Sequence, residues 1–304
     1  MAYAVIFPGQ GSQFSGMADP WAGHPSGSAV LEEASDALGR SIEEGCHDEA
    51  ALATTAFVQP ALLACDVAAF RVLAAEGLTD VVGVAGHSLG EFAALIAADA
   101  VALPDALELV LIRGAAMQRA GEERPGTMTA LLGLGADDAE SLCAEVRGDD
   151  VLVVANRNSP AQSVASGSIP AIERLEAVAK ERKTRAVRLQ VAGAFHSELM
   201  RPAVQPVLDL LERIEIRDPV IPIAENVTGE LVTQAARLRE LVGQQVVSPV
   251  FWETGIRNLA AAGATMFLEA GPGEVLTKLM KRIDPAPAAI AIADPEAART
   301  GLKA

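Results

Sequence analysis

The serine with the clearest chemical context is Ser88, which lies in the segment Gly86-His87-Ser88-Leu89-Gly90. An apolar run over residues 81–85 precedes this segment, and a run of small and apolar residues over 92–98 follows it. A Gly-x-Ser-x-Gly segment between a strand and a helix is typical of a nucleophile elbow, a tight turn that exposes the serine hydroxyl. The backbone N–H of Leu89 would then face an oxyanion formed beside Ser88. The segment therefore predicts a serine nucleophile, with an ordinary glycine-rich turn as the alternative.

A serine nucleophile needs a base within hydrogen-bond distance, and the chain contains four histidines. His24 and His47 lie in polar, loop-like segments and are interpreted as surface residues. His87 adjoins Ser88 on the elbow, so we expect its ring to point away from the hydroxyl and to line or orient the pocket. His196 is the only histidine downstream of the elbow, and we expect it to be the base. A capping or packing role is the alternative for His196.

The position of His196 in the chain also bears on what orients its ring. Serine hydrolases of the usual α/β type place an Asp or Glu after the serine and a histidine near the C-terminus. Here no histidine follows His196 in the sequence. We therefore expect a serine–histidine dyad whose imidazole is oriented by a backbone or amide carbonyl, and a carboxylate partner is the alternative.

The composition argues against several functional classes. Half of the 304 residues are hydrophobic, which suffices for a substantial core in one large domain or two. The longest candidate for a membrane span, residues 92–103, is short and contains Asp99, so we expect no transmembrane helix. The sequence shows neither a basic-then-apolar leader nor a Cys/His cluster with zinc spacing, so we expect no signal peptide and no metal site. The three scattered cysteines suit reduced thiols and predict a cytoplasmic protein.

The net charge of −16 argues against nucleic acid as a partner. Two groups of basic residues run against this trend. They are Lys180, Arg182, Lys183, Arg185 and Arg188, and then Lys278, Lys281 and Arg282. On an acidic protein such groups would attract an acidic partner, and a solvated helix face is the alternative.

The order of expected elements predicts an α/β fold. A strand over 3–7 leads into the loop Pro8-Gly9-Gln10-Gly11, where two glycines allow backbone N–H groups to face a ligand. Helices are expected over residues 29–45, 58–77 with Pro60 in the first turn, 104–121 and 197–214. The segment 127–190 reads β-α-β-β-α-β, which indicates a ferredoxin-like unit. We predict a core domain of residues 1–124 and 196–304, an inserted domain of residues 125–195, and a ligand cleft between them.

Seven segments match one protein family in order along the chain. They are Phe7-Pro8-Gly9-Gln10-Gly11-Ser12-Gln13, Gln59-Pro60-Ala61-Leu62, Gly86-His87-Ser88-Leu89-Gly90-Glu91, Arg113-Gly114, Ala155-Asn156-Arg157-Asn158-Ser159-Pro160, Ala194-Phe195-His196-Ser197 and Gly271-Pro272-Gly273. Together they resemble the malonyl-CoA:acyl carrier protein transacylases and the related polyketide synthase acyltransferases. The resemblance covers nearly the whole chain, and seven segments in register are far more specific than one.

The resemblance implies an α/β-hydrolase-like core with a ferredoxin-like insert, and a ping-pong acyl transfer. Ser88 would take the malonyl group from malonyl-CoA and pass it to the phosphopantetheine thiol of an acyl carrier protein, with His196 as base. Backbone N–H groups of Gln10 and Leu89 would form the oxyanion hole. Arg113 would bind the malonyl carboxylate through its planar guanidinium. Coenzyme A thioester and phosphopantetheine enter as substrates, and no bound cofactor is implied.

Further site residues are also implied by the resemblance. Gln59 belongs to a matched segment, and Gln245 matches the position whose backbone carbonyl orients the catalytic histidine, although Gln244 is adjacent. Phe195 beside the histidine resembles the malonyl-selective pattern, in which a bulky ring leaves little room for an α-methyl branch. One methyl group gives about 1–3 kcal/mol of discrimination, so this is a preference. Glu225 replaces a serine common in the family, and we expect its carboxylate to face away from malonate.

Four functions remain to be compared. A malonyl transferase of fatty acid synthesis is the first, and an acyltransferase that loads polyketide synthase carrier domains, with another acyl unit, would use the same site. A serine thioesterase or ester hydrolase would use the elbow with water, but Arg113 suits a diacid substrate. A non-catalytic carrier-binding module is disfavoured by the intact Ser88 and His196. The acidic carrier protein would dock on the basic residues Lys180, Arg182, Lys183, Lys278 and Lys281.

Overall fold

The computed structural model describes residues 1–283 and 285–303, and its core is a six-stranded sheet with the order β10-β9-β1-β2-β7-β8. The strands are β1 (Tyr3–Phe7), β2 (Val81–Gly86), β7 (Ile223–Ala224), β8 (Leu231–Val232), β9 (Met266–Ala270) and β10 (Ala289–Ile292). Each neighbouring pair is parallel except β7 and β8. Because parallel strands share one carboxyl edge, the loops that follow β1 and β2 meet there.

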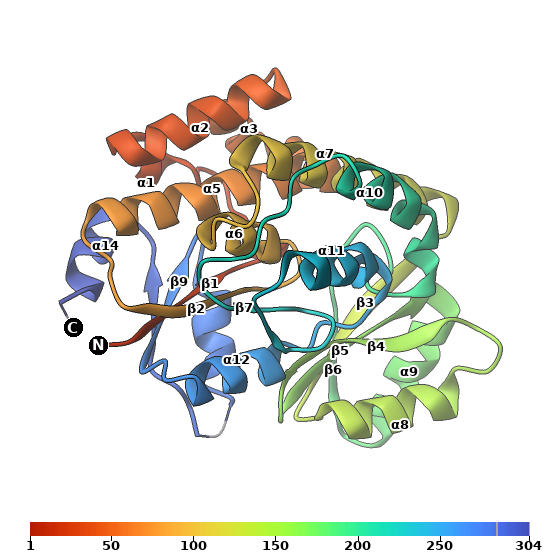
Figure 1. Ribbon diagram of the computed structural model, residues 1–304. Coiled ribbons are helices and arrows are strands. Elements are labelled where there is room, and N and C mark those ends of the chain that lie inside the picture. Colours follow the sequence, from red (N-terminus) through yellow and green to blue (C-terminus); the bar gives the residue numbers. More distant parts are fainter. Residues whose placement is uncertain (284, 304) are drawn as a thin grey trace.

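The side chains of β1 show why helices cover both faces of this sheet. All five residues are buried, and alternate side chains point to opposite faces. Tyr3, Val5 and Phe7 pack in one apolar cluster, whereas Ala4 and Ile6 pack in another. The first cluster includes α5 (Thr55–Ala75), α6 (Gly90–Ala97) and α7 (Leu103–Glu123), and the second includes α12 (Trp252–Ala261) and α13 (Val275–Met280). Accordingly, α5 and α6 lie on one side of the sheet and α12 on the other (Figure 1).

Helix α5 corrects two expectations. It begins at Thr55, so Pro60 lies inside the helix and not in its first turn. By length and composition alone it could also cross a membrane, whereas no segment of that kind was expected from the sequence. Within its most apolar 18-residue window, 83% is buried inside the protein. The apolar side chains of α5 therefore belong to the packed core, where the helix contacts α2 (Pro25–Leu38), α6 and α7.

The second sheet is antiparallel and has the order β4-β5-β3-β6. Its strands are β3 (Gly126–Leu132), β4 (Leu152–Ser159), β5 (Gln162–Ser168) and β6 (Arg185–Arg188), and α8 (Ala136–Val146) and α9 (Ile169–Glu181) pack on one face (Figure 1). The order along the chain is the predicted β-α-β-β-α-β. The α/β fold class with a small antiparallel unit is thus confirmed, and the exact domain limits stay predictions.

Helix boundaries differ from expectation where the backbone chemistry changes. The helix expected over 29–45 is two helices, α2 (Pro25–Leu38) and α3 (Ile42–Cys46), because Gly39 ends the first with a left-handed φ of 61°. The helix expected over 197–214 starts as a 3₁₀ turn at Glu198–Ala203, which contains Pro202, before α10 (Val204–Leu211). The remaining elements are α1 (Asp19–Ala22), α4 (Glu49–Leu52), α11 (Ala235–Gln244), a 3₁₀ turn at Gln245–Val247 and α14 (Pro295–Gly301).

Candidate active site

Ser88 lies in the turn between β2 and α6, at the carboxyl edge of the six-stranded sheet. Its φ angle is 53°, in the left-handed region that residues with a side chain rarely adopt. A Cβ at Gly86 would lie 1.9 Å from the carbonyl carbon of Gly90, and a Cβ at Gly90 would lie 2.2 Å from the Phe7 oxygen. The two glycines are therefore required for a turn this tight, and the Ser88 side chain faces a pocket.

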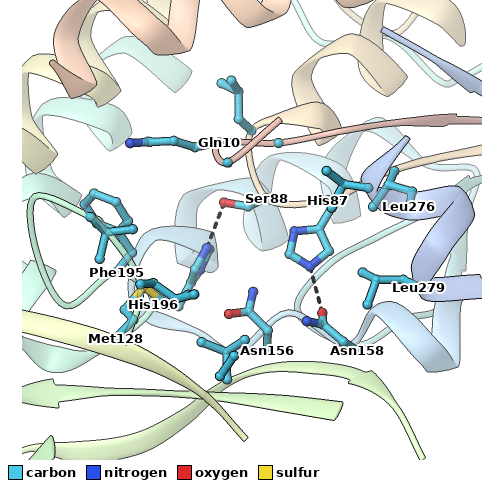
Figure 2. A pocket seen from close by; sticks show the side chains of 18 of the residues that line it. Gln10, His87, Ser88, Met128, Asn156, Asn158, Phe195, His196, Leu276 and Leu279 are labelled. Carbon is cyan, nitrogen blue, oxygen red and sulfur yellow. Dashed lines mark hydrogen bonds between the residues drawn. The ribbon is translucent and has the colours of Figure 1, made fainter. Parts of the chain in front are cut away.

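His196 follows the chain's return from the four-stranded sheet, and its ring points at Ser88 (Figure 2). Nε2 is 2.8 Å from Ser88 Oγ, and Nδ1 is 3.0 Å from the backbone oxygens of both Gln245 and Ser248. Because carbonyl oxygens only accept hydrogen bonds, Nδ1 carries the proton and the Nε2 lone pair faces the serine O–H. Among residues 1–283 and 285–303, no carboxylate contacts this ring, so the two side chains form a dyad.

The surroundings of His196 keep its imidazole neutral. Burial and the nearby Arg113 guanidinium lower the pKa of His196 to about 3. The backbone oxygens of Gln245 and Ser248 favour the protonated ring and offset only part of this effect. A general base has to be unprotonated before it takes the serine proton, and His196 meets that condition at neutral pH.

Arg113, on α7, reaches the turn that carries Ser88 and is only 1% exposed. Nη1 donates to Gln59 Oε1 at 2.7 Å, and Nη2 donates to Gln245 Oε1 at 2.8 Å. Nη2 also lies 3.3 Å from Ser88 Oγ. No carboxylate of the described residues lies within 4.0 Å of the guanidinium, and burial lowers the pKa of Arg113 to about 10. At neutral pH a buried cation therefore faces the nucleophile with neutral acceptors only, and a carboxylate is the anion that its fork fits best.

Gln245 joins Arg113 to the turn at Ser88. Its side chain is fully buried, and Oε1 accepts from Arg113. Nε2 donates to the backbone oxygen of Ser88 at 2.9 Å and also to the carboxyl group of Glu91. Gln244 instead makes its side-chain hydrogen bond on the exposed face of α11. The structure thus brings Gln245, and not its neighbour, into the site.

Two further buried residues, Glu91 and Asn226, adjoin the dyad without having been singled out from the sequence. Glu91 is 1% exposed, and its Oε1 accepts from the Asn226 backbone N–H at 2.9 Å. Burial and the neighbouring Glu225 carboxyl raise the pKa of Glu91 to about 8. The signal for Glu91 was present, because it is an acidic residue at the start of an otherwise apolar helix. Asn226 carried no comparable signal, since its role depends on contacts across the sheet.

Glu225 faces its own loop, as expected. Its carboxyl accepts from the backbone N–H groups of Val227 and Thr228 at 2.7 and 3.1 Å. It is 1% exposed and does not line the Ser88 pocket of the described chain. The substitution of glutamate at this position therefore places no negative charge beside the expected malonyl group.

The dyad opens into a pocket of about 410 Å³ between the two sheets (Figure 2). Gln59, Phe195 and Arg113 line it together with Ser88 and His196. The four-stranded sheet and the segment that follows β6 contribute five apolar lining residues and three amides, namely Met128, Ala130, Val164, Leu189 and Val191, and then Asn156, Asn158 and Gln162. The pocket therefore combines a polar end at the nucleophile with an apolar wall, as small-molecule sites commonly do.

His87 lines the same pocket with its ring turned away from the Ser88 hydroxyl (Figure 2). Its Nε2 is 2.9 Å from Asn158 Oδ1, so the ring contacts β4 of the small sheet. Burial lowers the pKa of His87, which favours the neutral ring. This placement agrees with a pocket-lining residue that links the elbow to the second sheet.

The Gly9–Gly11 loop presses against the elbow. A Cβ at Gly9 would lie 2.3 Å from the His87 oxygen, so only glycine allows this approach. Gln10 and Leu89 both line the pocket, and within the described chain the backbone N–H of neither residue donates a hydrogen bond. The N–H of Ser88, in contrast, is occupied by Asn226 Oδ1 at 2.7 Å. Among the described residues, the backbone N–H groups of Gln10 and Leu89 are therefore available to a ligand in the pocket.

The two basic groups lie in different places. Lys278 and Arg282 line the Ser88 pocket, and Lys278 pairs with Glu274 at 2.6 Å. Lys180 and Lys183 line a separate hollow beside α9 and β6. A third member of that group, Arg182, pairs with Glu145 at 2.6 Å. The structure therefore brings only the 278–282 group to the mouth of the pocket.

Comparison with known proteins finds relatives that match the chain over nearly its full length. A model of the acyl transferase domain family matches residues 4–288. The malonyl CoA-acyl carrier protein transacylase of Bacillus subtilis (strain 168) is 38% identical over 96% of this chain and 94% of its own length. The structure of the malonyl CoA-acyl carrier protein transacylase from Coxiella burnetii matches with a TM-score of 0.96 at 35% identity, over 100% of this chain and 97% of that one.

A further solved structure is a malonyl-transacylase in complex with a type II polyketide synthase acyl-carrier protein. It has a TM-score of 0.95 at 36% identity, covering 100% of this chain and 99% of that one. Matches of this identity over full length show more than a shared fold. The chain therefore belongs to the malonyl-CoA:acyl carrier protein transacylase family, within the wider group of acyl transferase domains.

Proposed function

We propose that the protein transfers a malonyl group from malonyl-CoA to the phosphopantetheine thiol of an acyl carrier protein, through an ester on Ser88. One observation carries this proposal: a buried arginine without a carboxylate partner in the described chain lies 3.3 Å from the hydroxyl of a serine–histidine dyad. A substrate with a thioester at one end and a carboxylate at the other fits both groups at once. Malonyl-CoA is the substrate in the names of full-length relatives.

The first half-reaction forms the malonyl ester. The Ser88 hydroxyl attacks the thioester carbonyl while its proton passes to His196 Nε2. The oxyanion that forms accepts hydrogen bonds from the free N–H groups of Gln10 and Leu89. When the C–S bond breaks, the His196 proton goes to the leaving coenzyme A sulfur, and the histidine is neutral again.

The second half-reaction runs through the same groups in reverse. His196 takes the proton of the phosphopantetheine thiol, and the sulfur attacks the ester carbonyl. The Ser88–acyl bond then breaks, and the histidine proton returns to the serine oxygen. Throughout both steps Arg113 holds the malonyl carboxylate, and its own position is fixed by the amide oxygens of Gln59 and Gln245.

Two features support a preference for malonyl over branched acyl groups and over hydrolysis. Phe195 is buried beside His196 and lines the pocket, where its ring limits space at the α-carbon. Arg113 favours a diacid over the neutral acyl groups of common esterase substrates. The carrier is either that of fatty acid synthesis or a polyketide carrier, and the latter is supported by the relative solved with a type II polyketide carrier. We place the reaction in the cytoplasm, where the free Cys46, Cys65 and Cys143 stay reduced.

The carrier protein would approach over the basic residues at the pocket mouth. Lys278 and Arg282 line the pocket, and Lys281 lies between them in the sequence. Reversing Lys278 and Lys281 to Glu should raise the KM for the carrier and leave that for malonyl-CoA alone. The matched reversal of Lys180, Arg182 and Lys183 tests the second group, which lines a separate hollow. An unchanged carrier KM in either variant would exclude that group from docking.

The central experiment is intact-protein mass after mixing with malonyl-CoA, methylmalonyl-CoA or acetyl-CoA. We expect a malonyl adduct on the wild-type protein, none on Ser88→Ala, and loss of the adduct when holo carrier protein is added. Carriers of fatty acid and polyketide synthesis are compared in the second step. Release of free malonate in place of transfer would show a hydrolase and overturn the proposal.

A further inference from the structure

Asn226 lies two residues after β7 and grips the nucleophile turn from outside the pocket. Its Oδ1 accepts from the Ser88 backbone N–H at 2.7 Å, and its Nδ2 donates to the Gly86 backbone oxygen at 2.7 Å. The residue is 3% exposed, and it is not among the residues that line the Ser88 pocket of the described chain. Its side-chain amide therefore acts on the backbone of the elbow and not on a substrate.

The register of the sheet explains why an amide fits at this point. β2 and β7 are parallel and pair at Val84 with Ile223 and at Ala85 with Ala224. The same register carried forward would set residue 226 beside residue 87. In a parallel ladder, a residue beside position 87 bonds the oxygen of residue 86 and the N–H of residue 88. The Asn226 side chain bonds these same two groups, so it continues the ladder past the end of β7.

The backbone of Asn226 is turned elsewhere and is itself held. Its N–H donates to Glu91 Oε1 at 2.9 Å, and its oxygen accepts from the Phe251 N–H at 2.7 Å. Glu91 belongs to α6, the helix that begins directly after the elbow. Asn226 thus bonds the end of β2, the start of α6 and the residue that precedes α12, and joins these three segments to one another.

Ser88 needs such support because its φ of 53° is unfavourable for a residue with a side chain. We propose that Asn226 is a positioning residue whose side-chain amide holds Ser88 in this left-handed conformation, with Oγ at His196 Nε2. The same contact occupies the Ser88 N–H, which leaves the Leu89 N–H as the donor on this side of the reacting carbonyl. The inference rests on the proposed role of Ser88 as nucleophile and adds a residue to it.

The test separates Ser88 reactivity from malonyl recognition. An alkyl fluorophosphonate phosphonylates an activated serine with loss of fluoride and needs no carboxylate clamp. We compare its second-order rate constant, and the acylation rate with malonyl-CoA, in the wild-type protein and in Asn226→Ala. Asn258→Ala is the matched control, because Asn258 on α12 also bonds a backbone oxygen, that of Gly229 at 2.8 Å, without touching the elbow.

We expect Asn226→Ala to lower both rate constants about 100-fold, the typical effect of misplacing a reacting group by roughly 1 Å. The KM for malonyl-CoA should change less than about threefold, because Arg113 and Gln245 keep their contacts to each other. Asn258→Ala should lower the melting temperature without changing the phosphonate rate. Equal phosphonate rates in wild type and Asn226→Ala, or an equal loss in Asn258→Ala, would contradict the positioning role.

A second variant keeps the test valid where Asn226→Ala is too unstable. In Asn226→Asp, the ionised side chain still accepts from Ser88 but repels the Gly86 oxygen, whereas the protonated acid donates to it and reproduces the amide. The neighbouring carboxyls of Glu91 and Glu225 raise the pKa of the new acid, and the Arg113 cation lowers it. The neutral rings of His87 and His196 also lie nearby.

We therefore expect the phosphonate rate of Asn226→Asp, relative to wild type at the same pH, to rise at least tenfold between pH 8 and pH 5. A pH-independent ratio would overturn the positioning role. Failure of the wild-type protein to react at Ser88 would instead contradict the nucleophile itself, and the positioning role with it. Malonyl transfer that fails while Ser88 still reacts with the phosphonate would contradict only the proposed substrate.

Discussion

The wall of the Ser88 pocket that belongs to the six-stranded sheet and the wall that belongs to the four-stranded sheet are built differently. Behind the first, Arg113, Gln245 and Glu91 are almost completely buried, and Gln245 forms hydrogen bonds with each of the other two. The second presents no charged side chain: five of its lining residues are apolar and three are amides, one of which, Asn158, contacts His87 of the elbow. Chemistry is thus concentrated on one wall, whereas the other wall determines shape. Substitutions on the two walls should therefore differ in kind as well as in size.

The free-energy penalty of burying a charged side chain explains why the polar wall has many hydrogen bonds. A buried cation without an anion is unfavourable, and amide oxygens offset only part of that penalty. Arg113 has two such amide oxygens, from Gln59 and Gln245. The remaining penalty disappears when a substrate carboxylate enters, so the wall favours diacids before any contact with the apolar wall is made.

The largest expected effect is that of removing His196, the catalytic base. His196→Ala should lower the rate of Ser88 acylation roughly 10⁴- to 10⁶-fold, the range for removal of a catalytic base from a serine dyad or triad. The rate is measured as malonyl adduct formation by intact mass. His47→Ala is the matched control, because His47 is exposed and pairs with the surface residue Asp19, at 3.0 Å. A loss of less than tenfold in His196→Ala would show that another group removes the proton.

Next in size is the carboxylate clamp. Arg113→Ala should lower kcat/KM for malonyl-CoA about 100-fold, which corresponds to about 3 kcal/mol for a charge-assisted pair. The kcat/KM for acetyl-CoA should fall much less, so the preference for malonyl-CoA over acetyl-CoA decreases. Arg113→Lys keeps the charge but lacks the planar fork, and we expect an intermediate value. Equal losses for malonyl and acetyl would mean that the arginine acts only on structure.

A smaller effect is expected where the pocket sets shape. Phe195→Ala should raise the ratio of methylmalonyl to malonyl transfer about tenfold, because one methyl group is worth about 1–3 kcal/mol in such a pocket. The ratio is measured in competition with both thioesters present. Val164→Ala, on β5 of the apolar wall, is the comparison and should change malonyl transfer by less than about threefold. An unchanged ratio in Phe195→Ala would assign the selectivity to another residue.

The smallest expected effect is that of pH on acylation. Because the pKa of His196 is lowered to about 3, its ring stays neutral between pH 5 and pH 8, and the acylation rate should change less than about twofold from this group. Stability behaves differently. In the unfolded chain His196 takes up a proton as the pH falls through 6.5, whereas in the folded protein it stays neutral down to about pH 3. The unfolded state is therefore increasingly favoured as the pH falls from 6.5 towards 3, and the free energy of unfolding decreases over this range. Stopped-flow kinetics measure the acylation rate at each pH, and urea unfolding midpoints measure the stability. An inflection of the acylation rate near pH 6.5 would contradict the lowered pKa of His196.

How much of this could be read from the sequence depends on the residue. Ser88 was identifiable because strand, glycine pair and helix are contiguous, and His196 because few histidines compete with it. The α/β order followed from local periodicity, and the family from seven segments. Gln59 and Gln245 came only with the family resemblance, since an isolated glutamine has no pattern. Glu91 had a local signal as an acidic residue at the start of an otherwise apolar helix, although its partners lie in distant segments. Asn226 acts only through contacts between distant segments, which no local rule predicts.

Helix α5 shows another property that the local sequence does not determine, namely what surrounds an apolar helix. By length and composition alone this helix could cross a membrane, even with Asp66 and Arg71 in its apolar run. The helix is nevertheless almost entirely core, because α2, α6 and α7 pack against it. Local hydropathy reports composition, whereas burial is decided by neighbours that are far away in the chain.

The place of β1 in the sheet has a consequence for synthesis on the ribosome. β1 is the first strand made, yet it lies between β2 and β9, and β9 comprises residues 266–270. Until those residues emerge, one edge of a fully buried apolar strand has no partner. Unpaired strand edges of this kind promote aggregation. Nascent chains shorter than about residue 270 should therefore depend on chaperones, and premature termination should yield insoluble protein rather than a partly active fragment.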